Sequence, residues 1–145
     1  MASQKQVQAV VDLHQTFTER DVPAFVTHLT DDVILRPSTL IAGREEYRGI
    51  KDVKKGFREL RDLLDSRGED VTVEPLRFYV DRGDDDLVVS LTRVTVTRAD
   101  EKPYSADLLY TWRMNGEKVA ELSASLDVDA GMEQLADAEE VEPAI

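Results

Sequence analysis

Two histidines and no cysteine occur among the 145 residues, so few side chains could carry acid–base or metal chemistry at neutral pH. His14 and His28 are 14 residues apart and no His-Glu-x-x-His motif is present, which argues against a zinc site. The lack of cysteine excludes a thiol nucleophile, a disulfide framework and a cysteine-held iron–sulfur cluster. We therefore predict that the protein holds no metal.

Motifs for other chemistries are missing as well. The chain has no Gly-x-Ser-x-Gly turn, no Walker loop and no Gly-x-Gly-x-x-Gly motif, so a nucleotide cofactor is not supported. The acidic run at residues 81–86 is not an EF-hand, because Gly83 stands at the third position, where a calcium ligand belongs. We predict no cofactor.

The charge balance and the apolar pattern argue against two kinds of partner. Lys and Arg total 18 against 30 Asp and Glu, a net charge of −12, whereas binding to duplex nucleic acid relies on basic side chains. No apolar run approaches the roughly 20 residues that span a bilayer. Residues 1–8 lack the apolar core of a secretory signal. We expect a cytoplasmic protein that binds neither nucleic acid nor membranes.

Three helices and a short strand are predicted for the first half of the chain. Apolar residues repeat at helical spacing in residues 4–20, and His14 falls inside this stripe. Asp21 and Pro23 suit the first turn of a second helix, which we expect to end at residues 30–32. The other predicted elements of this half are a strand at 33–35, a connector over 38–49 that contains Ala42-Gly43, and a helix over 50–66 ended by Arg67-Gly68.

Four long strands are predicted for the second half, at residues 71–81, 87–98, 104–114 and 118–127. Asn115-Gly116 joins the last two as a hairpin. Helices gathered before an antiparallel sheet imply an α+β fold. We expect a cone-like barrel, in which three N-terminal helices pack in the concave face of a curved, mostly antiparallel sheet and enclose a pocket.

The chain length suits one domain, which we assign to residues 1–136. From Ala130 onward there are five acidic residues and no Lys or Arg. We therefore expect residues 137–145 to be a disordered acidic tail that aids solubility.

Several local patterns occur in an order that resembles the SnoaL-like branch of the nuclear transport factor two-like superfamily, over residues 4–136. The patterns are Glu19-Arg20-Asp21, a helix-Leu-Asp-Asp-Val unit at residues 25–33, Tyr47-Arg48-Gly49-Ile50 before an amphipathic helix, and the hairpin at 112–119. The resemblance implies a homodimer formed through the sheet, with Leu109, Thr111 and Arg113 on the shared face. Members include polyketide cyclases, ketosteroid isomerases and transport factors without catalysis, so the fold does not settle the function.

The resemblance to ketosteroid isomerases implies a site made of His14, Arg36 and Tyr110, with Trp112 as an aromatic wall and Tyr47 at the rim. In those enzymes an oxyanion-donor Tyr stands at the position of His14 and a general-base Asp at the position of Arg36. Arg36 cannot be that base, because a guanidinium stays protonated. The catalytic candidates are therefore His14 and Tyr110, and the ligand-binding candidates are Arg36, Tyr47 and Trp112.

Each of these residues also has a structural interpretation. His14 is either a core histidine bonded to a neighbour or a polar group of the pocket, and we expect His28 to be structural. Arg36 is either ion-paired at the surface or buried, where it would favour an anionic ligand. Tyr110 and Trp112 alternate correctly to line the concave face, where core packing and ligand contact fit equally well.

Three functions are compatible with the sequence. The first is an enzyme of isomerase, cyclase or hydratase type, with His14 as acid–base and Arg36 or Tyr110 stabilising an enolate or carboxylate. The second is a non-catalytic protein that binds a small, largely apolar molecule, anionic if Arg36 is in the pocket. The third is a protein-interaction domain whose pocket is filled by core side chains.

Overall fold

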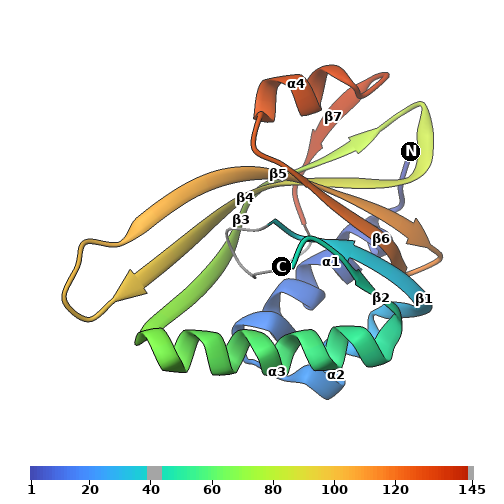
Figure 1. Ribbon diagram of the computed structural model, residues 1–145. Helices are drawn as coiled ribbons and strands as arrows, with labels where there is room; N and C mark the ends of the chain where they lie inside the picture. Colours follow the sequence, from blue (N-terminus) through green and yellow to red (C-terminus); the bar gives the residue numbers. More distant parts are fainter. Residues whose placement is uncertain (39–43, 144–145) are drawn as a thin grey trace.

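The computed structural model describes residues 1–38 and 44–143 and shows one curved sheet with helices on both faces (Figure 1). The helices are α1 (Gln4–Thr18), α2 (Val22–Thr27), α3 (Gly49–Arg67) and α4 (Val128–Glu133). The strands are β1 (Leu29–Arg36), β2 (Tyr47–Arg48), β3 (Glu69–Asp81), β4 (Asp84–Arg98), β5 (Tyr104–Asn115), β6 (Lys118–Ser125) and β7 (Ala138–Val141). The predicted α+β class is confirmed. Ala42-Gly43 of the predicted connector lies outside the described residues.

The seven strands found in the described residues form one sheet in the order β2-β1-β6-β5-β4-β3-β7. Every neighbouring pair is antiparallel except β1 and β6, which run parallel. In this parallel pair Leu35 lies opposite Leu122, so the N-terminal part of the chain joins the strand that follows the last hairpin. That hairpin turns at Gly116-Glu117, one residue later than predicted, because the β5–β6 register shifts near Met114.

Local capping explains where the helices begin and end. Ser3 caps α1 with a capping box, because its side chain accepts from the backbone N–H of Gln6 and the Gln6 side chain accepts from the N–H of Ser3. Asp21 caps α2 as predicted, through a 3.1 Å bond from the N–H of Ala24. Gly68 ends α3 in the left-handed conformation, as its position after Arg67 indicated.

The second helix is shorter than predicted. Helix α2 ends at Thr27, and β1 begins at Leu29 rather than at Val33. The apolar spacing of residues 22–29 favoured a longer helix. Pairing with β6 overrides this local preference, because the N–H of Val119 donates a 2.8 Å bond to the carbonyl of His28 and Val119 lies opposite Leu29.

The acidic C-terminal segment is ordered where we expected disorder. Residues Ala138–Val141 form β7, which pairs antiparallel with β3 at the edge of the sheet. The buried carboxylate of Asp81 accepts backbone N–H bonds of 3.0 Å from Ala136 and 3.1 Å from Asp137. The prediction of a disordered tail is therefore wrong for these residues, because a buried acceptor and a free strand edge hold them in place.

The helices divide the apolar side chains into two clusters (Figure 1). Helices α1, α2 and α3 cover one face of the sheet and enclose the large core, whereas α4 covers the other face. Under α4, Leu109 is only 1% exposed, packed with Leu87 and Val89. Among the described residues no helix is both long enough and apolar enough to cross a membrane.

Candidate functional site

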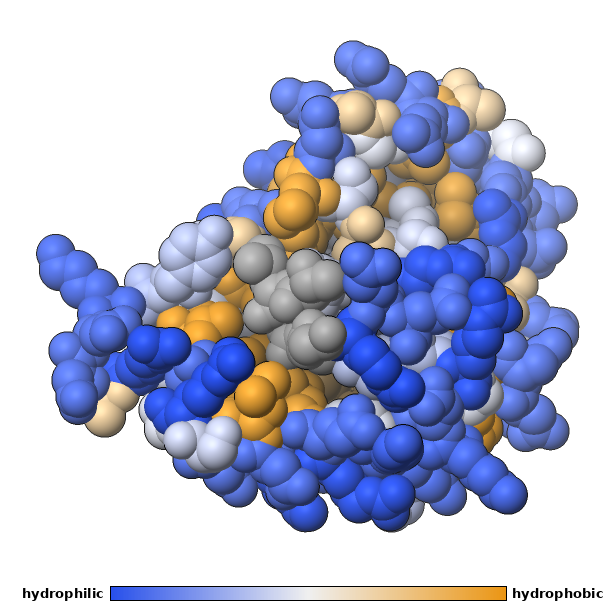
Figure 2. Space-filling view, in the orientation of Figure 1, coloured by the Kyte–Doolittle hydropathy of each residue, from blue (hydrophilic) through white to orange (hydrophobic). Residues whose placement is uncertain are grey.

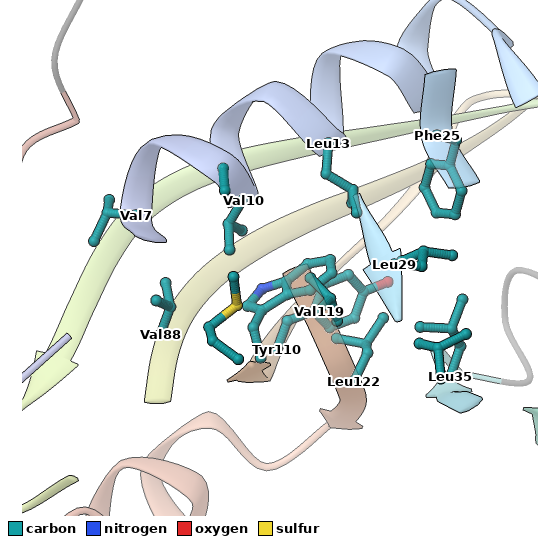
Figure 3. Close-up of a cluster of buried hydrophobic side chains, with 14 of the residues drawn as sticks. Val7, Val10, Leu13, Phe25, Leu29, Leu35, Val88, Tyr110, Val119 and Leu122 are labelled. Atoms are coloured by element: carbon teal, nitrogen blue, oxygen red, sulfur yellow. The ribbon is translucent and has the colours of Figure 1, made fainter. Parts of the chain in front are cut away.

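A pocket of about 90 Å³ lies between α1, α2, α3 and the sheet. We call it the α1–α3 pocket. Its lining is almost entirely apolar and aromatic, and it includes His14 on α1 and Tyr110 and Trp112 on β5. Figure 3 shows Tyr110 and Leu122, from the sheet, opposite Leu13 of α1. The pocket therefore lies within the main core and brings together four of the five predicted site residues, because Tyr47 lines it as well.

His14 is 5% exposed and is held in one orientation. Its Nδ1 lies 2.8 Å from the backbone carbonyl of Val10, one turn earlier on α1. A carbonyl oxygen can only accept, so Nδ1 carries the proton and Nε2 is left as an acceptor. Nε2 is buried and has no hydrogen-bond partner among the described residues. Burial lowers the pKa of His14 to about 4, against the opposing effect of the Val10 carbonyl, so the ring is neutral at pH 7.

Tyr110 is 3% exposed, and its hydroxyl also lacks a hydrogen-bond partner within the described part of the chain. Burial raises the pKa of Tyr110, so the hydroxyl keeps its proton at neutral pH and acts as a donor. The ring of Tyr110 meets that of Trp112 edge-on, with centroids 5.7 Å apart. The predicted placement of both side chains on the inner face of β5 is confirmed.

Trp112 contacts both of these side chains and forms part of the pocket wall. The His14 ring contacts its indole at a centroid distance of 5.2 Å. The indole Nε1 donates a 2.9 Å bond to Oγ of Ser90 on β4, and this Oγ lies 3.0 Å from Oγ1 of Thr92. Sequence reasoning missed Ser90 and Thr92. Their two-residue spacing places both on one face of a strand, but serine and threonine are mostly exposed in proteins, so the residue types gave no signal of a buried pair.

Tyr47 lies in the pocket lining, where it packs against α3. A Cβ atom at Gly56 would fall 2.3 Å from Cε1 of Tyr47, so only glycine leaves room for this ring. The guanidinium of Arg44 lies 4.3 Å from the centre of the ring on its face. Gly56 therefore determines where Tyr47 stands, a role that no sequence motif indicated.

Arg36 does not line the α1–α3 pocket as the structure describes it. Its guanidinium forms ion pairs with Glu46, at 3.0 Å, and with Glu121 on β6. These contacts, with the Glu121 hydrogen bond first, raise the pKa of Arg36. Its placement in the pocket is thus wrong, because two carboxylates hold it at the rim of the sheet and neutralise its charge. His28, which caps the end of α2, also lies outside the lining.

Three phenylalanines close the helical side of the pocket. Phe57 of α3 lies 4.8 Å from Phe25 and 5.7 Å from Phe17, measured between ring centroids. These rings fill much of the space between the helices, which keeps the cavity small. The opposite, solvent-facing side of α3 is covered by hydrophilic side chains, at the bottom of Figure 2.

The arrangement places one acceptor and one donor, both uncharged, in an apolar cavity. General-base catalysis near pH 7 works best with a base whose pKa is close to 7, and His14 lies well below that value. Within residues 1–38 and 44–143, no three histidine or acidic side chains gather in a way that could hold a metal ion. The geometry therefore suits recognition of a neutral molecule.

Comparison with known proteins identifies the family. A model of the SnoaL-like domain matches residues 10–122. No curated protein sequence matches the chain. Similar solved structures include TerC co-crystallized with polyporic acid, which is 18% identical, with a TM-score of 0.68 over 89% of this chain and 96% of that chain. An NTF2-like protein of unknown function from Burkholderia pseudomallei is 16% identical, with a TM-score of 0.67 over 91% and 98%.

A third similar structure is RV0760c from Mycobacterium tuberculosis in complex with estradiol-17beta-hemisuccinate. It is 12% identical, with a TM-score of 0.64 over 86% of this chain and 95% of that chain. At such identities the likeness concerns the fold alone. The match of the family model over most of the chain goes further, and it shows that the chain belongs to the SnoaL-like family.

Proposed function

We propose that this protein binds a small, largely apolar organic molecule in the α1–α3 pocket. The proposal rests on two buried polar atoms, Nε2 of His14 and the hydroxyl of Tyr110, for which residues 1–38 and 44–143 supply no hydrogen-bond partner in an apolar lining. Buried polar atoms in proteins are nearly always paired, and an unpaired one costs about 1–3 kcal/mol. A ligand that pairs with them would recover this cost.

The size of the cavity sets a condition on binding. A cavity of roughly 150 Å³ accommodates benzene. At about 90 Å³ the α1–α3 pocket is smaller, so a ligand of that size displaces side chains as it enters. Leu60, Val73 and Phe57 are only partly buried, which makes this end of the lining the easiest to move. Small-molecule complexes of TerC and RV0760c support such a use of the fold.

The experiment that tests the proposal is native mass spectrometry of the protein purified without denaturation, followed by extraction and identification of any bound compound. Val73→Phe narrows the pocket from β3, and we expect it to abolish retention of the compound. Val96→Phe is the matched control, because Val96 is also a partly buried strand residue but lies outside the pocket lining. Equal retention by both variants would contradict the proposal.

An isomerase- or cyclase-type enzyme is the second candidate, and the observation that favours it is the position of His14 in the pocket. Its lowered pKa makes it a weak base, so we place binding ahead of catalysis. Incubation of the extracted compound with the protein separates the two functions. Conversion that is lost in His14→Gln would establish the enzyme, whereas recovery of the unchanged compound would establish the binder.

A further inference from the structure

The two polar atoms that find no hydrogen-bond partner in the described part of the chain, Nε2 of His14 and the hydroxyl of Tyr110, are complementary rather than alike. His14 has its only N–H directed at the carbonyl of Val10, so its other ring nitrogen, Nε2, can only accept a hydrogen bond. The Tyr110 hydroxyl carries a proton that no described residue receives. A ligand that pairs with both atoms must therefore offer a donor to His14 and an acceptor to Tyr110.

The indole of Trp112 contacts the rings of both His14 and Tyr110. Tyr110 and Trp112 are two residues apart on β5, about 7 Å along the strand, and both face the core. The rings of His14 and Tyr110 each pack against the indole, at 5.2 Å and 5.7 Å. The two polar groups therefore border one aromatic ring, and a ligand that reaches both of them lies against the lining around Trp112.

The charge of the lining limits the ligand further. The described residues that line the pocket include no Asp, Glu, Lys or Arg. The one cation predicted there, Arg36, is committed to Glu46 and Glu121. A charged group moved from water into such a site is strongly disfavoured unless it is paired. We therefore expect an uncharged ligand. An anionic ligand, which a buried Arg36 would have favoured, would find no positive charge among the described lining residues.

From these observations we propose that the ligand is an uncharged hydroxy-carbonyl compound, whose hydroxyl donates to Nε2 of His14 and whose carbonyl oxygen accepts from the hydroxyl of Tyr110. The inference rests on the proposed function and names the ligand class. It also separates this pocket from an oxyanion hole, which needs donors on both sides of one oxygen. Here one of the two groups accepts, so the site recognises two different groups of one molecule.

Four matched probes test the polarity of the pocket at pH 6.5 by isothermal titration calorimetry. They are 4-hydroxyacetophenone, acetophenone without the hydroxyl, 4-ethylphenol without the carbonyl, and the 4-hydroxybenzoate anion. We expect 4-hydroxyacetophenone to bind about tenfold more tightly than acetophenone or 4-ethylphenol, since one good hydrogen bond is worth about a factor of ten. We expect no detectable binding of 4-hydroxybenzoate.

The outcomes separate the two proposals. Equal binding of acetophenone, 4-ethylphenol and 4-hydroxyacetophenone would overturn the hydroxy-carbonyl inference and leave the apolar pocket as a binding site. Preferred binding of 4-hydroxybenzoate would overturn it as well. If none of the four compounds binds and the purified protein retains no compound, the proposed function itself fails.

Tyr110→Phe tests the donor directly. We expect about a tenfold loss of affinity for 4-hydroxyacetophenone and unchanged affinity for 4-ethylphenol. We also expect a melting temperature of the free protein that is unchanged or higher, because the variant removes a buried hydroxyl that pairs with none of the described residues. Tyr79→Phe is the matched control, since Tyr79 packs against the cluster under α4. A clearly lower melting temperature for Tyr110→Phe alone would show that the hydroxyl is paired and would overturn the inference.

His14→Phe tests the acceptor while keeping a ring at that position. We expect this variant to bind 4-hydroxyacetophenone and acetophenone with equal affinity, because the ligand hydroxyl loses its acceptor. Circular dichroism serves as the control that this variant is folded. Retention of the wild-type preference for 4-hydroxyacetophenone in the folded variant would contradict the assigned role of His14.

Discussion

The indole Nε1 of Trp112 donates a 2.9 Å hydrogen bond to Oγ of Ser90, a side chain with no exposed surface. This bond joins the inner faces of β4 and β5 and sets the plane of the indole, which both His14 and Tyr110 contact. A buried strand serine thus positions the wall of the pocket. Trp112 is also the only tryptophan in the chain, so its fluorescence reports on this site alone.

Ser90→Ala should loosen this wall. The substitution leaves Nε1 of Trp112 buried without an acceptor, which we expect to lower the free energy of unfolding by about 1–3 kcal/mol. Urea denaturation measures this change, and the emission maximum of Trp112 in the folded state should shift. Ser105→Ala is the control, because Ser105 lies on the exposed part of β5. Equal effects of the two variants would show that Ser90 has no special role.

The stability of the protein should fall as the pH falls from 6.5 to 4, in part because of His14. Burial lowers the pKa of His14 to about 4 from an ordinary value of 6.5, so between these values the unfolded state binds a proton that the folded state does not. The full shift corresponds to roughly 3 kcal/mol. Urea denaturation across this range should show a shallower fall for His14→Gln.

His28→Gln is the matched control for this titration, because His28 is half-buried at the end of α2 and lies outside the pocket. We expect the control variant to follow the pH dependence of the unchanged protein. An unaltered pH dependence of His14→Gln would contradict the neutral state of the buried imidazole.

Gly56→Ala should displace Tyr47. The added Cβ would fall 2.3 Å from the ring, and the ring cannot stay in place. Overpacking costs about 1–3 kcal/mol, whereas alanine in a helix gains about 1 kcal/mol over glycine, so the net change in stability is small or unfavourable. The ring resonances of Tyr47 in NMR spectra should shift. Lys54→Ala, at an exposed position of α3, should leave them unchanged.

Asp81→Asn should release β7 from the edge of the sheet. The carboxylate accepts backbone N–H bonds from Gly83, Ala136 and Asp137, and these bonds, that of Gly83 first, lower the pKa of Asp81. An asparagine has one acceptor oxygen, and its amide group would face N–H donors. We expect at least about tenfold faster amide exchange in Ala138–Val141, measured by mass spectrometry.

Asp86→Asn controls for the loss of one negative charge near the same turn, because Asp86 lies close to the start of β4 and its side chain is exposed. Amide exchange in β7 should be unaffected in this variant. Faster exchange in both variants would assign the effect to charge rather than to the hydrogen bonds of Asp81.

A homodimer formed through the sheet stays a prediction, and the structure limits which residues could form it. Leu109 is covered by α4 of its own chain, and Arg113 forms an ion pair with Asp84. Size-exclusion chromatography with light scattering should give twice the chain mass, and Thr111→Arg should give the mass of one chain. A single-chain mass for the unsubstituted protein would contradict the prediction.

Local patterns in the sequence were enough to predict a large part of the candidate site and of the fold. Apolar spacing along α1 placed His14 on the buried face, and strand alternation placed Tyr110 and Trp112 together on the inner face of β5. The N-cap of α2 at Asp21 and the end of α3 at Gly68 could also be predicted from the sequence, because a helix cap depends only on the few residues that form it. These features depend on neighbours within about one turn or one strand.

Partners distant in sequence decided the rest. Arg36 meets Glu121 because β1 pairs in parallel with β6, and Trp112 meets Ser90 because of the β4–β5 register. Residues Ala138–Val141 become a strand because β3 offers an unpaired edge. The sequence alone thus determined which faces are buried, since periodicity requires only neighbouring residues. Only the tertiary structure decided which buried polar atoms find partners, because that depends on which segments the fold brings into contact.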